Sequence, residues 1–379
     1  LTKFPFTTKD DLRLLAYPHG GDFLCIPREE LILWHMTSGT TGEPAIGPYT
    51  YKDHETWMNL AARSYVAAGV GRGDIIMNIY GYGLFTGGLG LHQSAGLVGA
   101  AVIPWSIGRT KMLAKSLKDF GVTVMTGTPS YQSYICEVVK EVGIDPEKDL
   151  KLRITMPGAE IWTEGMRKRI EEGFALKSRG GGARNIYGAT ELCGPGVAIE
   201  CVYEKGLHVW TDHLYLEIID PKTLEPVEPG EEGEMVFTHL TREGMPLIRY
   251  RIGDLTILDT EPCECGRDAF PRCQWIRGRV DDVIHFKGVK IYPAAVEQVL
   301  LQTGRVKEYQ IVVDKTVMPY ELTIRVEVEG DPDEGFGRRL ADDLWNAIFV
   351  KPRVEMLAPG SLPRFEGKSK RVMIKEEGV

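Results

Sequence analysis

The strongest constraint on the fold is an alternation of patterns that begins near residue 75. Short runs of apolar and β-branched residues end in Gly or Pro, and the stretches between them show apolar residues at helical spacing. Strands that alternate with helices predict an α/β fold whose parallel sheet is covered on both faces. The five predicted strands lie at residues 75–80, 100–105, 122–126, 152–156 and 183–187.

One of the intervening helices can be predicted in detail, over residues 112–120. Leu113, Leu117 and Phe120 lie at helical spacing and predict a single apolar face, and Gly121 is a typical stop for the helix. Ligands of parallel sheets bind beyond the carboxyl ends of the strands. We therefore expect the functional residues in the glycine-containing turns at that edge.

The second half of the chain has a different pattern. Strands are predicted at residues 214–220, 233–240 and 248–258, and later at 309–313 and 322–328, followed by a helix at 338–349. A chain of 379 residues is too long for one ordinary domain. We expect a large N-terminal domain, residues 1–280, with a β-rich subdomain at about 200–280, and a small α+β C-terminal domain, residues 281–379.

Composition and charge exclude several classes of partner. The chain carries 45 basic and 53 acidic side chains, a net charge of −8, which argues against binding to nucleic acid or anionic membranes. No apolar run reaches the roughly 18–20 residues of a membrane span. Seven cysteines are few for this length and indicate a reduced protein. We expect a cytoplasmic protein.

A loop rich in glycine and hydroxyl residues is the first candidate binding motif. Its backbone N–H groups and hydroxyls could surround an anion such as a phosphate. The spacing differs from the Walker A loop, and a flexible turn explains the same composition, so the loop alone leaves both interpretations open. Its residues are Thr37, Ser38, Gly39, Thr40, Thr41 and Gly42.

Three further motifs carry groups that suit a nucleotide. Directly after a predicted strand, the Tyr187 ring could stack on a base beside the turn residue Gly188, while Thr190 could bind a phosphate oxygen and Glu191 could bind Mg²⁺. Asp254 could accept hydrogen bonds from ribose hydroxyls, and Arg279 matches a phosphate. A basic run near the C-terminus contains Lys368. Each motif alone is also explained by an ordinary turn or a solvated face.

In this order and spacing, the four motifs resemble the adenylate-forming superfamily of acyl-CoA synthetases, and within it the phenylacetate-CoA ligase family. The stretches at 80–92, 128–131, 158–160 and 194–197 are also similar to that family. The resemblance implies the adenylate-forming fold with a small mobile C-terminal domain. It also implies a two-step reaction, in which ATP and an acid give an acyl-adenylate and coenzyme A then forms a thioester.

The resemblance implies a role for each motif residue. The loop 37–44 holds the β- and γ-phosphates, and Tyr187 lies against adenine. Gly158, Ala159, Glu160 and Gly188 also bind the nucleotide. Thr190, Glu191 and Lys368 are catalytic: Thr190 contacts the α-phosphate, Glu191 binds Mg²⁺, and Lys368 bridges the substrate carboxylate and the α-phosphate. Asp254 holds the ribose, Arg279 contacts ribose or phosphate, and Asp281 is the hinge.

The substrate implied by the resemblance is an aryl carboxylic acid such as phenylacetate. Aromatic side chains suit an aryl ring but are also ordinary core residues; those near the expected acyl pocket are Tyr80, Tyr82, Phe85 and Tyr131. Two alternatives stay open: an adenylyltransferase that passes AMP to a deazaflavin-type cofactor without a thioester, and a non-catalytic nucleotide-binding protein. A homodimer is also an expectation.

Two positions depart from the family pattern. Glu43 stands where many members have Lys in the phosphate loop, which places a negative charge near the pyrophosphate. The chain starts at Leu1, in a segment that follows an N-terminal helical portion in relatives, and this predicts a fragment of a longer protein.

The cysteines suggest one metal site. Cys263 and Cys265 form a C-x-C pair, and Cys201 and His208 could join it as a closed, structural zinc site. Cys273 is the alternative fourth ligand, and free buried cysteines are the alternative to any metal. We interpret Cys25, Cys136 and Cys193 as small apolar residues.

Overall fold

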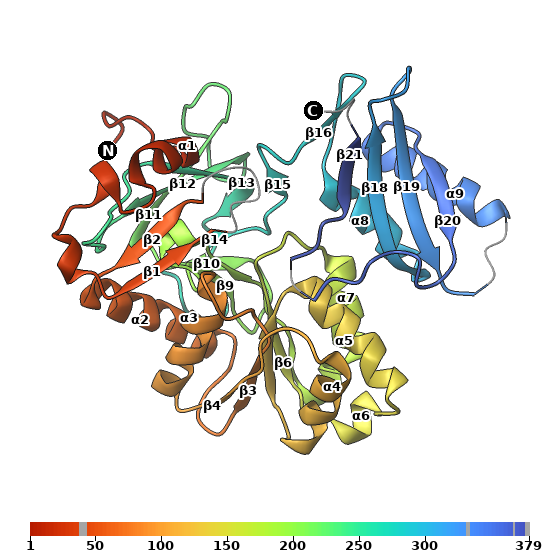
Figure 1. Cartoon of the computed structure of the whole chain (residues 1–379), viewed down its shortest axis with the longest axis horizontal. Coiled ribbons are helices and arrows are strands. Elements are labelled where there is room, and N and C mark those ends of the chain that lie inside the picture. The colour runs from red at the N-terminus through yellow and green to blue at the C-terminus, as the bar shows by residue number, and fades with distance from the viewer. Residues whose placement is uncertain (38–43, 331–333, 367, 376–379) are drawn as a thin grey trace.

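The computed structural model describes residues 1–37, 44–330, 334–366 and 368–375. It consists of a large part that contains the N-terminus and a smaller part formed by the C-terminal segment (Figure 1). None of the described helices is long and apolar enough to cross a membrane.

The large part is built around a five-stranded parallel sheet. Its order is β4 (Ala101–Pro104), β3 (Ile75–Asn78), β5 (Val124–Gly127), β6 (Ile154–Pro157) and β7 (Gly182–Ala183). The helices of this part are α1 (Lys9–Asp11), α2 (Tyr51–Ala67), α3 (Thr86–Ala95), α4 (Thr110–Asp119), α5 (Pro129–Glu141), α6 (Pro146–Asp149) and α7 (Glu164–Gly173).

Neighbouring residues of β3 show that both faces of this sheet are covered. Ile76 lies in one buried cluster with residues of α2 and α3, such as Leu60 and Leu91. Met77 points to the other face and lies in a cluster with residues of α4, α5 and α7. The α/β fold with a covered parallel sheet is therefore confirmed.

Two details of the prediction are wrong. The run 183–187 is not one strand: β7 ends at Ala183, and Ile186–Tyr187 forms β8 in a different sheet. The break falls at buried polar residues, since the Asn185 N–H donates to Glu200. In α4, Leu113 and Leu117 are fully buried, but Phe120 is 57% exposed because the helix ends at Asp119 and turns away from the core.

A second, mainly antiparallel sheet contains most strands predicted beyond residue 200. Its order is β11 (Leu214–Ile219), β12 (Glu232–His239), β13 (Tyr250–Asp259), β14 (Arg272–Cys273), β10 (Leu207–Val209), β9 (Ala198–Glu200) and β8, with β15 (Gly278–Arg279) paired to β13. The hairpin β1 (Leu33–Met36) and β2 (Ile46–Tyr49) lies beside it. This sheet therefore links Tyr187, on β8, to Asp254, on β13.

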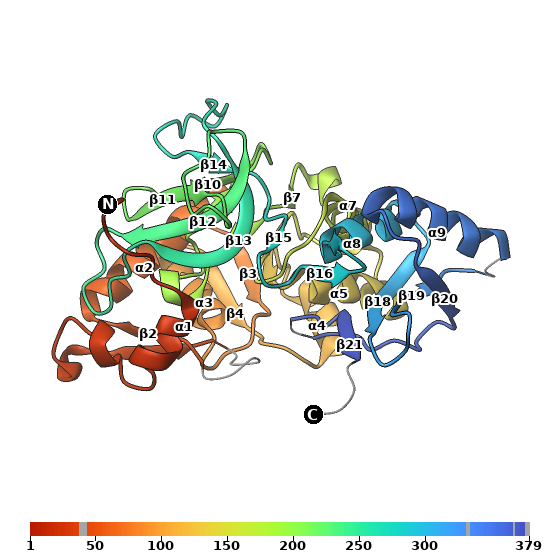
Figure 2. The same cartoon turned by 90° about the horizontal axis from the view of Figure 1, so that it is seen from above.

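The C-terminal part has its own sheet and core. The sheet order is β20 (Arg353–Leu357), β19 (Glu321–Val328), β18 (Val306–Asp314) and β21 (Val372–Lys375), preceded by the hairpin β16 (Ile284–Phe286) and β17 (Val289–Ile291). Helices α8 (Pro293–Gln302) and α9 (Glu334–Ile348) pack on this sheet (Figure 2). Leu340, Leu344 and Ile348 are buried against it, as their spacing predicts.

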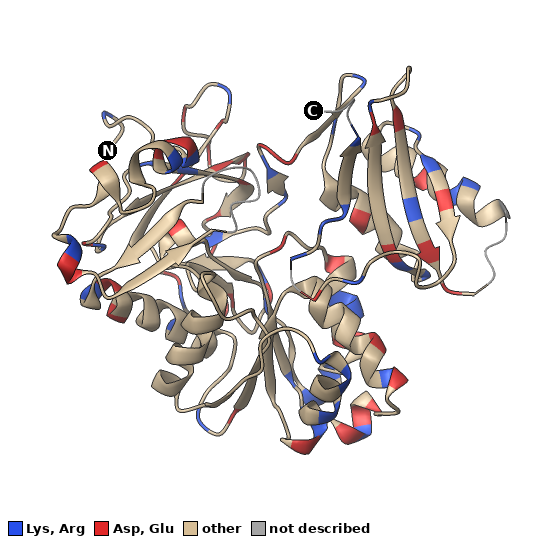
Figure 3. Cartoon of the chain, in the orientation of Figure 1, with Lys and Arg blue, Asp and Glu red and all other residues tan. Residues whose placement is uncertain are grey.

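Charges of both signs are intermingled on the surface. In the view of Figure 3, Lys and Arg lie among Asp and Glu along α7 and over the C-terminal sheet. Neither sign dominates the part of the molecule that this view displays.

Candidate active site

Several predicted site residues meet at the carboxyl edge of the parallel sheet. Tyr80 follows β3, Gly158 and Ala159 follow β6, and Gly188 follows β8. A small pocket, partly open to solvent, lies between them. Its walls are Tyr80, Phe85, Thr86, Gly87, Ala159, Ile186, Gly188 and Pro195. The position agrees with the rule that parallel sheets bind ligands beyond the ends of their strands.

Close backbone approach explains the glycine at position 158. A Cβ there would lie 2.3 Å from the carbonyl oxygen of Ile186, which is a backbone atom that cannot swing away. The next residue, Ala159, has a φ of 67°, a conformation that favours glycine, so this turn stores backbone strain. Strain of this kind is typical of functional sites.

Three of the predicted nucleotide-binding residues are in direct contact. The Tyr187 hydroxyl donates to Asp254 at 2.6 Å, and Arg279 Nη1 donates to the other oxygen of that carboxylate at 2.6 Å. Burial raises the pKa of Asp254 above its ordinary value, and the nearby Arg279 and Lys368 cations oppose that rise. Arg279 also donates to Asp281 at 2.9 Å, which connects this cluster to the predicted hinge.

Glu191 lies in a second polar cluster, on the 3₁₀ turn Thr190–Leu192. Its carboxylate accepts a hydrogen bond from the Tyr250 hydroxyl at 3.2 Å, and Lys9 Nζ lies 3.4 Å from the same oxygen. Arg242 fixes the turn by donating to the Glu191 carbonyl at 2.7 Å. One carboxylate beside a phosphate site suits Mg²⁺, which binds one or two carboxylates plus substrate phosphates. Lys9 was missed because no motif surrounds it.

The phosphate loop can be located only at its first residue. Thr37 accepts a hydrogen bond from the Ala45 N–H at 3.0 Å, just after β1. The other predicted loop residues lie outside the described part of the chain, as does the departure at Glu43: they are Ser38, Gly39, Thr40, Thr41 and Gly42.

The segment around Lys368 is bound to the large part of the molecule on both sides of that residue. Glu366 accepts a hydrogen bond from the Thr110 hydroxyl at 2.8 Å. On the other side, the Ser369 N–H donates to Glu160, whose second oxygen accepts from the Ser130 N–H at 3.2 Å. These contacts, which we call the Lys368 clamp (Thr110 with Glu366, and Glu160 with Ser369), bring an exposed Lys368 side chain within electrostatic range of Asp254.

The predicted substrate aromatics separate into two groups. Tyr80 and Phe85 line the pocket, with ring centroids 6.1 Å apart. The Tyr82 hydroxyl instead accepts from Asn78 Nδ2 at 2.9 Å. Tyr131 is fully buried, and its hydroxyl lies 3.1 Å from that of Thr110, next to the Lys368 clamp. A contact of Tyr82 or Tyr131 with substrate stays a prediction.

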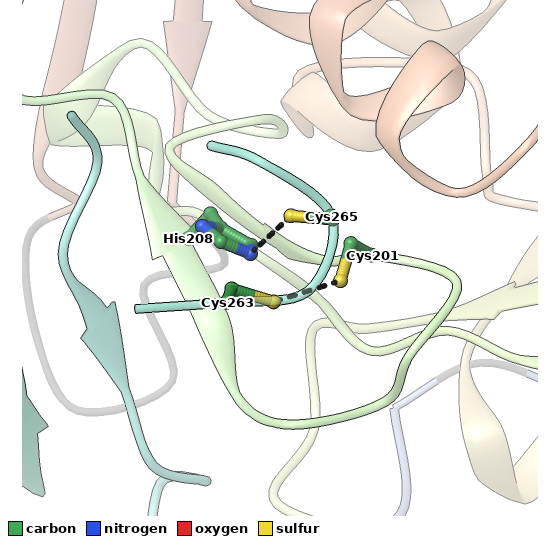
Figure 4. A group of neighbouring side chains, drawn as sticks. All are labelled: Cys201, His208, Cys263 and Cys265. Carbon is green, nitrogen blue, oxygen red and sulfur yellow. Dashed lines mark hydrogen bonds between the residues drawn. The ribbon is translucent and has the colours of Figure 1, made fainter. Parts of the chain in front are cut away.

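The four predicted metal ligands lie together in the antiparallel sheet (Figure 4). Their ligand atoms are all within 4.8 Å of one another; the residues are Cys201, His208, Cys263 and Cys265. Cys273 is not in this group. It pairs with Leu207 and lies with it in a buried apolar cluster, whereas His208 pairs with Arg272 and points to the other face of the sheet. Of the three cysteines interpreted as small apolar residues, Cys136 and Cys193 are buried and Cys25 is exposed.

The chain is similar to known families and to individual known proteins. The family model described as AMP-binding enzyme matches residues 19–240, and that of the AMP-binding enzyme C-terminal domain matches residues 288–375. Phenylacetate-coenzyme A ligase of Thermus thermophilus is 42% identical, covering 98% of this chain and 86% of the relative. That of Pseudomonas putida is 40% identical, covering 97% and 83%.

Among solved structures, 2-hydroxyisobutyryl-CoA ligase in the postadenylation state, in complex with 2-HIB-AMP, matches with a TM-score of 0.90. The identity is 28%, over 98% of this chain and 80% of that one. The same enzyme with CoA in its thioesterification state matches with a TM-score of 0.68, at 30% identity over the same shares of the chains. The chain belongs to the phenylacetate-coenzyme A ligase family of AMP-binding enzymes.

Proposed function

We propose that this chain is an ATP-dependent aryl acid–coenzyme A ligase. It joins phenylacetate or a related aryl carboxylate to coenzyme A, with AMP and pyrophosphate as the other products. The observation that carries this proposal is the position of Lys368: the clamp holds its segment so that Lys368 lies within electrostatic range of Asp254, which contacts Tyr187 and Arg279. The sequence relatives named phenylacetate-coenzyme A ligase support the substrate class.

The arrangement suits the first half-reaction, in which the substrate carboxylate attacks the α-phosphorus of ATP. The Asp254 carboxylate would accept hydrogen bonds from the ribose hydroxyls, while the Thr190 hydroxyl and the Lys368 ammonium would bind the α-phosphate. Lys368 supplies a positive charge where negative charge builds in the transition state, and it needs no proton transfer. Positioning and electrostatic stabilisation therefore account for most of the catalysis we expect.

Mg²⁺ fits the chemistry of the donors around Glu191, and when bound it would neutralise charge on the phosphates. Glu191 is buried and already fixed by Tyr250 and Arg242. Lys9, 3.4 Å from the Glu191 carboxylate, adds a cation on the same side.

The pocket beside Tyr80 and Phe85 is our proposed acyl site. Its walls combine the aromatic rings of Tyr80 and Phe85 with Gly87 and Gly188. A Cβ at Gly87 would lie 2.4 Å from the Phe85 ring, so the glycine allows that ring to pack at the wall. Ala159, a predicted nucleotide-binding residue, also lines this pocket. An acid bound there would therefore point its carboxylate toward the nucleotide.

The second half-reaction requires a different arrangement of the two parts. The present arrangement is closer to the postadenylation state of 2-hydroxyisobutyryl-CoA ligase than to its thioesterification state, with TM-scores of 0.90 and 0.68. We propose that residues 281–379 rotate at Asp281, release the Lys368 clamp and bring residues 286–293 to the site of thioester formation. Such domain rotations are a known way to alternate two half-reactions. The homodimer and the cytoplasmic location stay predictions.

One assay tests the proposal against its alternatives. The protein is incubated with ATP, Mg²⁺ and a panel of aryl acids, with and without coenzyme A, and AMP and acyl-CoA are followed. We expect AMP and an aryl-CoA thioester that depends on coenzyme A. AMP transfer to a deazaflavin-type cofactor without thioester would indicate the adenylyltransferase, and ATP binding without turnover would indicate a non-catalytic protein.

A further inference from the structure

We propose that Cys201, His208, Cys263 and Cys265 bind one zinc ion in a closed, structural site. The proposal is independent of the ligase reaction, because the four residues are apart from the pocket and from the residues that meet at Asp254. Three of the four are buried, so the ligands are removed from bulk water. Figure 4 shows their side chains pointing toward a common centre.

The distances between the ligand atoms match the edges of a zinc tetrahedron. With Zn–S of about 2.3 Å and Zn–N of about 2.0–2.1 Å, the edges are about 3.8 Å between sulfurs and about 3.6 Å between sulfur and nitrogen. Cys201 Sγ and Cys263 Sγ are 3.7 Å apart. Cys265 Sγ and His208 Nε2 are 3.3 Å apart. Small side-chain rotations would complete the site.

A hydrogen bond holds His208 in the tautomer whose Nε2 can bind a metal. Its Nδ1 lies 3.2 Å from the Phe270 carbonyl oxygen, which only accepts hydrogen bonds, so Nδ1 carries the proton. Nε2 is then left with a free lone pair, and it is this atom that faces Cys265. A carbonyl that orients the imidazole of a ligand is a common feature around metal sites.

The backbone around the cysteines is also fixed before any metal arrives. The Cys263 N–H donates to Asp268 at 3.1 Å, and a turn joins the Gly266 N–H to the Cys263 carbonyl at 2.9 Å. Glu200, directly before Cys201, accepts from Arg167 at 2.8 Å and from Trp275 Nε1 at 2.6 Å. Since the ligands are held in place, little ordering entropy opposes binding.

The four ligands come from three segments of the chain, so a bound metal would hold these segments together. Cys201 follows β9, His208 is on β10, and the C-x-C pair lies in the connection from β13 to β14. In sheet order, β14, β10 and β9 are the strands that separate β13, with Asp254, from β8, with Tyr187. A metal at this point would hold the β13–β14 connection on the strands that set the distance between Tyr187 and Asp254.

Chemistry favours zinc over other metals and a structural over a catalytic role. Three thiolates and one imidazole in a tetrahedron are a typical structural zinc set, and four protein ligands leave no position for water or substrate. On binding, each of the three thiols releases its proton to solvent, and no electron transfer occurs. The proton release makes zinc affinity fall at low pH.

The test measures metal in the untagged, full-length chain purified under reducing conditions without chelator. We expect about one zinc per chain in the wild type, and loss of it in Cys263→Ser and Cys265→Ser. Cys273→Ser and Cys136→Ser are matched controls, because both cysteines are buried but lie outside the cluster, and both variants should keep the full zinc content. Zinc-free wild-type protein that takes up none from added zinc would overturn the proposal.

Cobalt provides a readout that does not depend on the variants folding. The zinc-free wild type titrated with Co²⁺ should show strong thiolate-to-cobalt charge-transfer absorption and the intense visible bands of tetrahedral cobalt, saturating at one equivalent. Weak octahedral bands would contradict the site. A non-reducing mass lower by two hydrogens, with no metal uptake after reduction, would assign the cysteines to a Cys201–Cys263 disulfide and also overturn it. Metal-free protein should melt at a lower temperature, and added zinc should restore the original value.

Discussion

The charge of Lys368 is useful only where the rest of the molecule places it. Its side chain is exposed, but it acts on a buried Asp254 that already contacts Tyr187 and Arg279. A lysine in a basic C-terminal run is ordinary, and these neighbours are what make it a candidate catalyst. Burial raises the pKa of Asp254, and the Arg279 and Lys368 cations oppose that rise.

Replacement of Lys368 separates the two half-reactions. Lys368→Ala should slow adenylation by about 100-fold or more, because a preorganised charge on the transition state is lost. Thioester formation from supplied acyl-adenylate should stay close to wild type. Pyrophosphate exchange and a single-turnover thioester assay measure the two steps. Lys370→Ala, a nearby exposed lysine, is the control, and equal loss of both steps in Lys368→Ala would contradict the role.

Gly158 tests close packing at the strand end. Gly158→Ala would place a Cβ 2.3 Å from the Ile186 carbonyl oxygen. We expect a loss of about 1–3 kcal/mol in the free energy of unfolding, since the backbone must move, together with weaker nucleotide binding. Gly96→Ala is the control because nothing lies within 4 Å of its Cβ. Urea unfolding measures the free energy of unfolding of both variants. Similar free energies for Gly158→Ala and Gly96→Ala would show that the turn at Gly158 accommodates a Cβ at little cost.

At the scale of elements, β19 holds the segment that leads to Lys368. Glu327 at the end of β19 is buried and accepts from the N–H groups of Gly360 and Leu362, and from Arg364 at 2.8 Å. Burial alone would raise the pKa of Glu327, but these hydrogen bonds hold it below its ordinary value. This carboxylate therefore connects a strand to a functional loop.

The lowered pKa of Glu327 predicts a dependence of stability on pH. Its folded pKa is lower than the 4.5 of a free glutamate, so its contribution is complete above pH 4.5 and is lost as pH falls through the folded value. Glu327→Gln should cost about 1–3 kcal/mol at neutral pH. It should also flatten the fall in the free energy of unfolding below pH 4.5. Urea unfolding at several pH values measures both, and parallel pH curves for the two proteins would refute this account.

The Lys368 clamp makes a second element-scale prediction. Thr110→Val removes the donor to Glu366 and keeps the side-chain shape, whereas Thr110→Ser keeps the hydroxyl. A hydrogen bond to a carboxylate contributes about 1.5–3 kcal/mol, so the valine variant should adenylate roughly tenfold more slowly. Thioester formation should be unaffected because the clamp is then released. If the serine variant lost as much activity as the valine variant, the hydroxyl would not be the cause.

At the scale of the whole molecule, the two parts meet through a buried polar contact. Glu297 on α8 accepts from the Thr163 hydroxyl, which caps α7, at 3.1 Å, and from Tyr309 at 2.7 Å. Burial raises the pKa of Glu297, although Arg371 opposes the rise. Such a contact stabilises one relative orientation of the two parts, and the proposed rotation would have to break it.

The hinge proposal has its own test. Asp281→Pro fixes φ at about −65° and so restricts rotation at that residue. We expect adenylation to persist and thioester formation to slow by about tenfold or more, while Asp281→Ala keeps both steps. Pyrophosphate exchange measures adenylation and a single-turnover assay measures thioester formation. Thioester formation should be the slowed step here, whereas Lys368→Ala slows adenylation. A proline variant with normal thioester formation would place the hinge elsewhere.

Much of the fold follows from local pattern. Burial imposes a period on the sequence, so two features could be predicted from it: the strands before β7 and the apolar face of Leu340, Leu344 and Ile348. The order of the motifs could also be recognised directly in the sequence. The break at residues 184–185, where the chain passes from β7 in one sheet to β8 in another, could not be predicted from the sequence. The burial of Asn185 is explained by a hydrogen bond from its N–H to Glu200, which lies on a different strand, β9.

The sequence by itself determined the family, the α/β class and the residue types that bind a nucleotide, because these depend on short motifs and periodic burial. Only the tertiary structure decided which of those residues meet. It placed Lys9 beside Glu191, bound the Lys368 segment to Thr110 and Glu160, and removed Cys273 from the metal cluster. These contacts join residues far apart in the chain, and their distances depend on the packing of whole sheets, which leaves no local mark on the sequence.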